Sequence, residues 1–417
     1  MNTMKRVVIT GLGAITPLGN SVPEYWNSLV QGKSGAASIT RFDASTLKTR
    51  FACEVKNFDP LLYMEKSEAR KNDLFSQYAL AATHECIQDS EVNFETVDRN
   101  RCGVIWATGI GGIGTFEKEI QEYFAPENKG RMNPFFITKM IPNMASGIIS
   151  IKYGLHGASY ATVSACSSSN HALTDSYNLI KLGKADMMLA GGSEAPVTIS
   201  TLSGFSVMRA LSERNDSPES ASRPFDEKRD GFVLGEGAGV LMLEELEHAR
   251  KRGAKIYAEM TGYGLASDAY HITSSHPEGL GAKLAMAEAM RDGGLKPEDI
   301  DYINAHATST SIGDLSESRA ISTIFDSCLD QVIVGGTKSM TGHLLGAAGA
   351  IEATCCVLAV KNNLIPPTIN LQNRDTEIDS RIRVESEVCH QEVRAALNNS
   401  FGFGGHIVST LFQKYQE

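Results

Sequence analysis

The sequence has none of the linear motifs that commonly hold a metal ion. It contains no H-E-x-x-H run, no C-x-x-C pair and no D-x-D-x-D-G loop. Histidine and cysteine ligands for zinc, and acidic ligands for calcium, usually occur at such spacings. We therefore expect no metal and no other cofactor that the protein itself must hold. Any chemistry then has to run on side chains and backbone donors.

An excess of basic charge is also absent. Lysine and arginine number 39 against 49 aspartates and glutamates, which gives a formal net charge of −10 at pH 7. General binding to nucleic acid needs a basic surface, so this class of function is disfavoured. Hydrophobic content of 42% and charged content of 21% are ordinary for a globular enzyme.

Long hydrophobic runs and a disulfide framework are missing as well. The sequence shows no run of 18 apolar residues and no N-terminal apolar segment with a cleavage site. The eight cysteines have no regular spacing, and Cys355 and Cys356 are adjacent in an apolar stretch, so we expect free thiols. These features predict a cytoplasmic protein that does not cross a membrane.

Short apolar strands alternate with amphipathic helices along the chain, which predicts an α/β fold. Strands are expected at Val7–Thr10, Gly103–Thr108, Ala161–Ser164, Met187–Gly191, Val240–Glu244, Ala258–Tyr263, Tyr302–Asn304 and Val332–Gly335. Helices are expected at Tyr25–Gln31, Leu74–Asp89, His171–Leu182, Leu280–Asp292, Leu315–Phe325 and Ala347–Lys361. The Pro366-Pro367 pair ends the last helix and leads into extended structure.

Two pairs of segments indicate an internal duplication. The strand-to-helix segment Ala161–Ser176 resembles Ile333–Thr354, and the glycine-containing strand Val7–Gly13 resembles Ala258–Gly264. The 417 residues also exceed the roughly 250–300 at which a single core stops growing. We predict two halves, residues 1–255 and 256–417, with the seam near residues 250–257.

Cys166 is the first candidate for chemistry. It follows a β-branched strand and precedes small hydroxyl residues and a helical run. A thiol at the first turn of a helix faces unpaired backbone N–H groups that carry roughly half a positive charge. A thiolate is stabilised there, so we expect the pKa of Cys166 to lie below the free value of about 8.5. The pattern is typical of a nucleophile.

Two histidines are candidate partners of this thiol. His306 ends a short apolar strand, and His343 lies in a turn rich in glycine and threonine. A lone histidine at a strand end is more often a hydrogen-bonded structural residue. Two of them in small-residue turns leave room for a substrate, and their N–H groups can donate to a developing oxyanion.

The run Gly109–Gly114 matches G-x-G-x-x-G after a predicted strand, so a dinucleotide site has to be weighed. Such a site needs a helix that starts on the glycines and a second strand that ends in an acidic residue about 20 positions on. The segment from Phe116 to Pro134 is charged and offers no such strand, so we disfavour a nicotinamide site.

Seven motifs in order resemble the β-ketoacyl-acyl carrier protein synthases, most closely the elongating 3-oxoacyl-ACP synthase II type. They are Val7–Gly13, Thr162–Cys166, Ser222–Asp226, Arg229–Gly239, Asn304–His306, Thr337–Gly349 and Asn399–Gly405. The resemblance implies the thiolase fold, with duplicated βαβαβαββ halves packed as an α-β-α-β-α five-layer sandwich, normally in a homodimer.

The resemblance also implies a role for each matching residue. Cys166 takes the acyl chain as a thioester, and the oxyanion hole is formed by the backbone N–H groups of Cys166 and Phe403. His306 and His343 hold the malonyl thioester carbonyl during decarboxylation. Lys338, paired with Glu352, orients the histidines and tunes the electrostatics of the site.

Further residues match the family's substrate and carrier contacts. Phe403 resembles a gating phenylalanine whose neighbouring glycines relax the backbone. The expected substrate-binding residues are Thr308, Thr310, Thr273 and Ser274 for phosphopantetheine, and Ile110 and Phe205 along the acyl chain. Phosphopantetheine arrives on the acyl carrier protein, so the enzyme itself needs no cofactor. The carrier is acidic, and the expected basic docking residues are Lys66, Arg70, Lys71, Lys129, Arg131 and Arg209.

Three positions depart from the family pattern. Ala307 stands where glycine is usual, Ser311 where proline is frequent, and Ile407 where asparagine is common. These changes leave two pathways open: two-carbon elongation in fatty acid biosynthesis, or a ketosynthase of a specialised polyene or type II polyketide pathway, with a partner subunit in some cases.

Three related classes are disfavoured. A thiolase needs a second catalytic cysteine in the C-terminal glycine motif, which has none, since Cys389 lies outside it. A non-catalytic chain-length partner would lack the nucleophile Cys166. The initiating synthases use Cys-His-Asn, whereas this chain has His343 in the third position.

Overall fold

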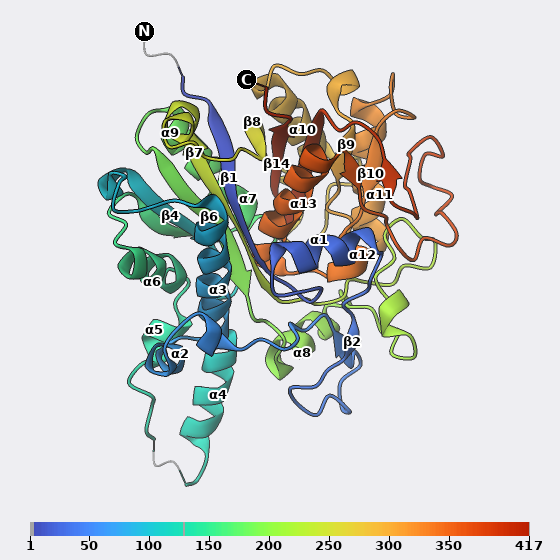
Figure 1. Ribbon diagram of the computed structural model, residues 1–417. Coiled ribbons are helices and arrows are strands. Elements are labelled where there is room, and N and C mark those ends of the chain that lie inside the picture. Colours follow the sequence, from blue (N-terminus) through green and yellow to red (C-terminus); the bar gives the residue numbers. More distant parts are fainter. Residues whose placement is uncertain (1–3, 128–129, 417) are drawn as a thin grey trace.

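The computed structural model describes residues 4–127 and 130–416, whose main feature is one ten-stranded sheet (Figure 1). Its strands follow the order β10-β9-β13-β14-β8-β1-β7-β6-β4-β5. The first five in sequence are β1 (Val7–Ile15), β4 (Cys102–Ala107), β5 (Ser159–Thr162), β6 (Met187–Glu194) and β7 (Gly237–Glu245). The others are β8 (Ala258–Ser267), β9 (Tyr302–Asn304), β10 (Ile333–Gly335), β13 (Ala395–Gly402) and β14 (His406–Gln413).

The strand order repeats itself across the middle of the sheet. Starting from the centre, one half reads β1-β7-β6-β4-β5 and the other reads β8-β14-β13-β9-β10. In each half, the first two pairs of neighbouring strands, counted from the centre, are antiparallel and the next two pairs are parallel. The halves meet where β1 pairs with β8 over three residue pairs, from Val7↔Met260 to Ile9↔Ala258. This arrangement is the duplication that the sequence predicts.

Helices cover both faces of each half and fill the space between them. The bounds are α1 (Val22–Val30), α2 (Lys66–Lys71), α3 (Leu74–Ser90), α4 (Ile113–Phe124), α5 (Phe136–Met140), α6 (Met144–Tyr153), α7 (Ser168–Lys181), α8 (Ile199–Val207), α9 (Leu246–Lys251), α10 (Leu280–Asp292), α11 (Ser311–Ile324), α12 (Lys338–Thr341) and α13 (Ala348–Asn362). Two short hairpin sheets pair β2 (Ala37–Ser38) with β3 (Phe51–Ala52), and β11 (Leu364–Ile365) with β12 (Cys389–His390).

The layers follow from which helix packs on which strand. Helices α3 and α6 pack on the N-terminal half, α10 packs on β8 and β14, and α11 packs on α10. Helices α7 and α13 contact each other between the two half-sheets, α7 on β6 and β4 and α13 on β13 and β7. The resulting five layers, helix-sheet-helix-sheet-helix, are those expected for the fold class.

Helix α13 forms the middle of the largest core cluster. Its residues from Ala348 to Val360 are all buried. The window Leu345–Asn362 is long and apolar enough to cross a membrane by length and composition, and 89% of it is buried inside the protein. A helix surrounded by sheets on two sides has no polar face to offer water, which explains its composition.

Several expected boundaries are corrected by the structure. The predicted strand Ala161–Ser164 lies two residues earlier, at Ser159–Thr162, because its last residues turn toward the following helix. That helix, α7, begins at Ser168 rather than His171. Helix α9 ends at Lys251 and β8 begins at Ala258, so most of residues 250–257, where the sequence predicts the seam, form the connection between these two elements.

Candidate active site

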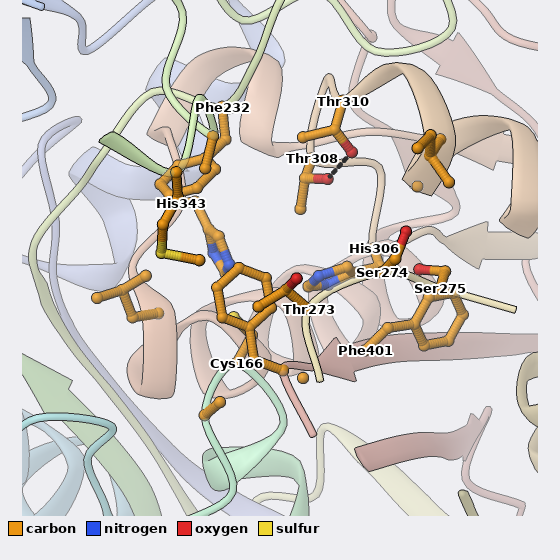
Figure 2. Close-up of a pocket in the computed structure, with 18 of the residues that line it drawn as sticks. Cys166, Phe232, Thr273, Ser274, Ser275, His306, Thr308, Thr310, His343 and Phe401 are labelled. Carbon is orange, nitrogen blue, oxygen red and sulfur yellow. Dashed lines mark hydrogen bonds between the residues drawn. The ribbon is translucent and has the colours of Figure 1, made fainter. Parts of the chain in front are cut away.

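Cys166 lies in the short connection between β5 and α7. The preceding residue, Ala165, has a φ of +51°, in the left-handed region that side chains rarely adopt. This sharp turn places Cys166 two residues ahead of the helix, with its side chain at the wall of a pocket (Figure 2). Only 8% of the residue is exposed.

The prediction that the pKa of Cys166 lies below its free value is wrong. Burial raises the pKa of this thiol to about 12, and the nearby Glu194 carboxylate also raises it. Lys338 and the backbone N–H groups of Phe403 and Cys166 itself lower it, but by less. The thiol is two residues short of the helix and almost fully desolvated, so the cost of burying a charge exceeds the help from the helix terminus.

His306 and His343 reach Cys166 from two other segments. His306 follows β9, and His343 lies between α12 and α13. One ligand atom from each of the three side chains lies within 4.8 Å of the others, and the two rings are nearly perpendicular with centroids 5.3 Å apart. Figure 2 shows the three side chains on one side of the pocket. The structure thus assembles the trio that the sequence proposed, from residues up to 177 positions apart.

Both imidazoles are held in their neutral form. Burial lowers the pKa of His306 and that of His343 well below 6.5, and the ammonium of Lys338 lowers both further. Among the described residues, none is a hydrogen-bond partner for Nδ1 of His306 or for either ring nitrogen of His343. A neutral imidazole has one N–H donor, so these rings are ready to donate to a substrate oxygen.

Lys338 and Glu352 form a buried ion pair behind the histidines. The distance from Lys338 Nζ to Glu352 Oε1 is 2.5 Å, and both side chains are 1% exposed. Burial raises the pKa of Glu352 to about 7, while Lys338 opposes that rise. Lys338 begins α12 and Glu352 lies on α13, so the pair joins the two helices that flank His343.

The carboxylate of Glu317, on α11, binds the backbone N–H groups of His306 and of the next residue, Ala307. Its Oε1 accepts the His306 N–H and its Oε2 accepts the Ala307 N–H, each at 2.9 Å. Asn399 Nδ2 donates to Oε1 at 3.1 Å. Burial raises the pKa of Glu317 to about 7. Sequence reasoning missed this residue, because a glutamate inside a helix pattern resembles any solvent-facing one.

The pocket in front of these groups has a volume of about 340 Å³. Every predicted substrate-binding residue lines it: Ile110, Phe205, Thr273, Ser274, Thr308 and Thr310, together with Phe403. The hydroxyl oxygens of Thr308 and Thr310 lie 3.1 Å apart. Figure 2 marks the hydrogen bond between them with a dashed line.

Phe403 stands at the wall of this pocket beside Phe205. The two ring centroids are 6.5 Å apart. Gly404 and Gly405 follow with φ of +89° and +77°, a backbone that other residues rarely adopt.

The glycine run after β4 forms part of the pocket wall. Gly109 and Ile110 line the pocket, and the Gly109 N–H donates to the buried Glu194 carboxylate. Helix α4 begins inside the run, at Ile113, and the next described strand is β5, with no strand ending in an acidic residue between them. The start of the run therefore contributes to the wall of the pocket.

The departures from the family pattern also lie at the pocket. Ala307, Ser311 and Ile407 all line it. Ala307 has a φ of +38°, which explains why glycine suits this position. Ile407 is buried, with 2% exposed.

The predicted docking residues occupy two places on the surface. Lys66, Arg70 and Lys71 are exposed on α2, as expected, and Arg70 and Arg131 line a shallow hollow that also contains Glu119 and Glu122. Arg209 lies instead among the residues of the active-site pocket. Lys129 lies outside the described residues.

Comparison with known proteins identifies the family. Residues 4–249 match the family model of the β-ketoacyl synthase N-terminal domain, and residues 257–372 match that of the β-ketoacyl synthase C-terminal domain. The chain belongs to the β-ketoacyl synthase family. A curated relative, 3-oxoacyl-[acyl-carrier-protein] synthase 2 of Synechocystis sp., is 48% identical over 99% of each chain.

Solved ketosynthases share the fold over nearly the whole chain. The ishigamide ketosynthase/chain length factor aligns with a TM-score of 0.92 and 32% identity, over 99% of this chain and 100% of that one. A type II polyketide ketosynthase, AntDE, solved with its acyl carrier protein AntF, gives 0.91 and 31% over the same shares. The expected thiolase fold is thereby confirmed.

Proposed function

We propose that this chain is a 3-oxoacyl-ACP synthase that lengthens a Cys166-bound acyl chain by two carbons in fatty acid biosynthesis. The observation that carries the proposal is the meeting of Cys166, His306 and His343 at one wall of a 340 Å³ pocket. Identity of 48% over the full length with a protein of that name supports it.

The first step is acyl transfer. The Cys166 sulfur attacks the thioester carbonyl of the acyl carrier protein, and the departing pantetheine sulfur takes up the thiol proton. Negative charge that develops on the carbonyl oxygen is stabilised by the N–H groups of Cys166 and Phe403, which already face the sulfur. Lys338 favours the thiolate against the cost of burial.

The second step creates the carbon nucleophile. The malonyl thioester oxygen accepts hydrogen bonds from His306 and His343, carbon dioxide leaves, and its bond electrons form an enolate. The enolate carbon attacks the acyl-Cys166 carbonyl, and the Cys166 thiolate departs and is reprotonated. Loss of one such donor typically costs ~10²–10³ in rate. The proposed steps use the side chains and backbone donors of the chain.

Lys338, Glu352 and Glu317 act as positioning residues. The Lys338–Glu352 pair fixes the helices around His343, and Glu317 fixes the backbone of His306. Three of the four ring nitrogens of His306 and His343 have no hydrogen-bond partner among the described residues. The orientation of the two rings is therefore set by packing and by these backbone contacts.

The acyl carrier protein is the proposed partner, since a related ketosynthase has been solved in complex with its carrier. The exposed cations of α2 supply local positive charge on a chain of net charge −10. An acidic carrier docks by such charge complementarity.

The proposed assembly is a homodimer formed through β5. This strand ends the sheet and has one described neighbour, β4. Tyr160 and Val163 are 40% and 58% exposed, and Ile151 of the adjacent α6 is 80% exposed. An open edge with apolar side chains favours pairing with a second copy.

The proposed location is the cytoplasm, because all eight cysteines are free thiols, as a reducing compartment keeps them.

A specialised polyene or polyketide pathway is the second candidate, because Ala307 and Ile407 alter the pocket and ketosynthases of such pathways share the fold. A panel of acyl-ACPs with malonyl-ACP, read by intact mass, separates the two. Extension of ordinary saturated chains by two carbons supports fatty acid elongation. Acceptance of polyunsaturated chains alone supports the second candidate, and no extension of any chain contradicts both.

A further inference from the structure

We propose that Cys166, His306 and His343 together form a binding site for Zn²⁺, and that the bound ion reversibly blocks the nucleophile. This inference goes beyond the proposed function, because binding needs only the three side chains and no acyl substrate. The residues come from three distant segments, so no linear motif in the sequence announces the site.

The ligand set suits zinc in its chemistry. Zinc prefers cysteine sulfur and histidine nitrogen, and mobile zinc sites often have three protein ligands with a fourth position open. The three side chains here are buried, with 8%, 7% and 2% of Cys166, His306 and His343 exposed. The fourth position faces the pocket, which has room for water.

The distances allow coordination after a small adjustment. The three ligand atoms lie within 4.8 Å of one another. In a tetrahedral site with bonds of ~2.0–2.3 Å they lie about 3.3–3.6 Å apart, so each has to move inward by less than about 1 Å. Ring rotation supplies that movement, since within residues 4–127 and 130–416 no hydrogen bond holds either nitrogen of His343 or Nδ1 of His306.

The local charge does not forbid a cation. Lys338 is the cation that acts on all three side chains, but its ammonium is paired with Glu352 at 2.5 Å. The buried Glu194 carboxylate also acts on Cys166, with the opposite sign of charge. Coordination replaces the thiol proton, which is released to solvent, and ties the sulfur lone pair to the metal. The sulfur then no longer attacks a thioester, and a chelator restores it.

The test uses the full-length protein and two readouts that require no acyl substrate. Co²⁺, a coloured substitute for Zn²⁺, is titrated and followed by its thiolate-to-metal absorption. In parallel, the rate at which iodoacetamide labels Cys166 is measured by peptide mass spectrometry with Zn²⁺, Mg²⁺ or EDTA. We expect one bound Co²⁺ that Zn²⁺ displaces, and labelling slowed at least about tenfold by Zn²⁺ but unchanged by Mg²⁺, which prefers oxygen ligands.

Variants separate this site from other thiols. Cys166→Ala should abolish the absorption, and His343→Asn should weaken binding at least about tenfold through loss of one ligand. Cys389→Ser is the matched control, because Cys389 is the one partly exposed cysteine of the eight and is followed by His390, and it should bind normally. If His343→Asn fails to fold, Cys166→Ala decides alone. Unchanged labelling with Zn²⁺, or full metal binding in Cys166→Ala, overturns the proposal.

Discussion

The reactivity of Cys166 depends on a balance between burial and nearby donors. The sequence predicts the nucleophile and its position before a helix, but not the direction of its pKa. Desolvation depends on what packs around the side chain, and the groups that oppose it, Lys338 and the backbone of Phe403, also come from segments far along the chain. A local pattern therefore identifies the residue type needed but not the energy of its charged form.

The raised pKa predicts how the free enzyme responds to pH. With a thiol pKa of about 12, the thiolate fraction of Cys166 rises about tenfold per pH unit across neutral pH. Iodoacetamide labelling of Cys166 should therefore increase without a plateau up to pH 9. A plateau below pH 8 would contradict this account.

Lys338 is the first of the groups that lower the Cys166 pKa. Lys338→Met should accordingly slow Cys166 labelling at a fixed pH. The exposed Lys296→Met is the control and should leave the rate unchanged. Equal labelling of Cys166 in both variants would show that the ammonium does not tune the thiol.

Ala307 predicts an unusual effect of a glycine substitution. Alanine at a φ of +38° is strained, so Ala307→Gly should leave the free energy of unfolding unchanged or raise it by up to about 1 kcal/mol. Ala287→Gly, on the exposed face of α10, should lower it by about 1 kcal/mol. Urea unfolding of both variants measures the difference. A loss of 1 kcal/mol or more in Ala307→Gly would refute the strain.

At the scale of elements, regular patterns were predictable and interrupted ones were not. Strand β9 and helix α10 have the predicted bounds, because apolar periodicity and flanking turns define both. Strands β13 and β14 were not predicted. Their buried faces include Asn398, Asn399 and Ser409, which hydrogen-bond to buried partners from other elements. From sequence alone, a polar residue in a strand can be predicted to be buried only when its hydrogen-bond partner is known.

The free edge of β5 predicts the assembly state. Val163→Lys places a charge beside this edge and should convert the proposed dimer to a monomer, since an unpaired charge in an apolar interface is costly to desolvate. Leu284→Lys on α10, 54% exposed in the other half of the molecule, should leave the dimer intact. Light scattering after size-exclusion chromatography distinguishes the two. Monomeric native protein, or dimeric Val163→Lys, would contradict the edge as the interface.

At the scale of the whole molecule, an acidic chain has to attract an acidic partner through a local patch. The double variant Lys66→Glu/Lys71→Glu should raise KM for malonyl-ACP several-fold with kcat little changed, because docking charges act mainly on encounter. Lys296→Glu, which changes an exposed cation in the segment after α10, is the single-site control. Equal KM values at low salt would place the carrier elsewhere.

The convergence of the site is also a property of the whole molecule. Sequence motifs nominate Cys166, His306 and His343 one by one, but only the paired half-sheets bring them within 4.8 Å. Glu317 and Glu194 carry no motif of their own, and their buried contacts become visible only in the folded chain. The fold class was predictable because the duplication repeats in sequence as well as in space.

The central claim is that Cys166 carries the growing chain. The most direct test is the intact mass of the protein after incubation with acyl-ACP and then with malonyl-ACP, compared with Cys166→Ala. The account predicts one acyl adduct on the native chain, mapped to Cys166, that disappears on malonyl-ACP addition as a 3-oxoacyl-ACP two carbons longer is released. An acyl adduct on another residue, or condensation by Cys166→Ala, would contradict it.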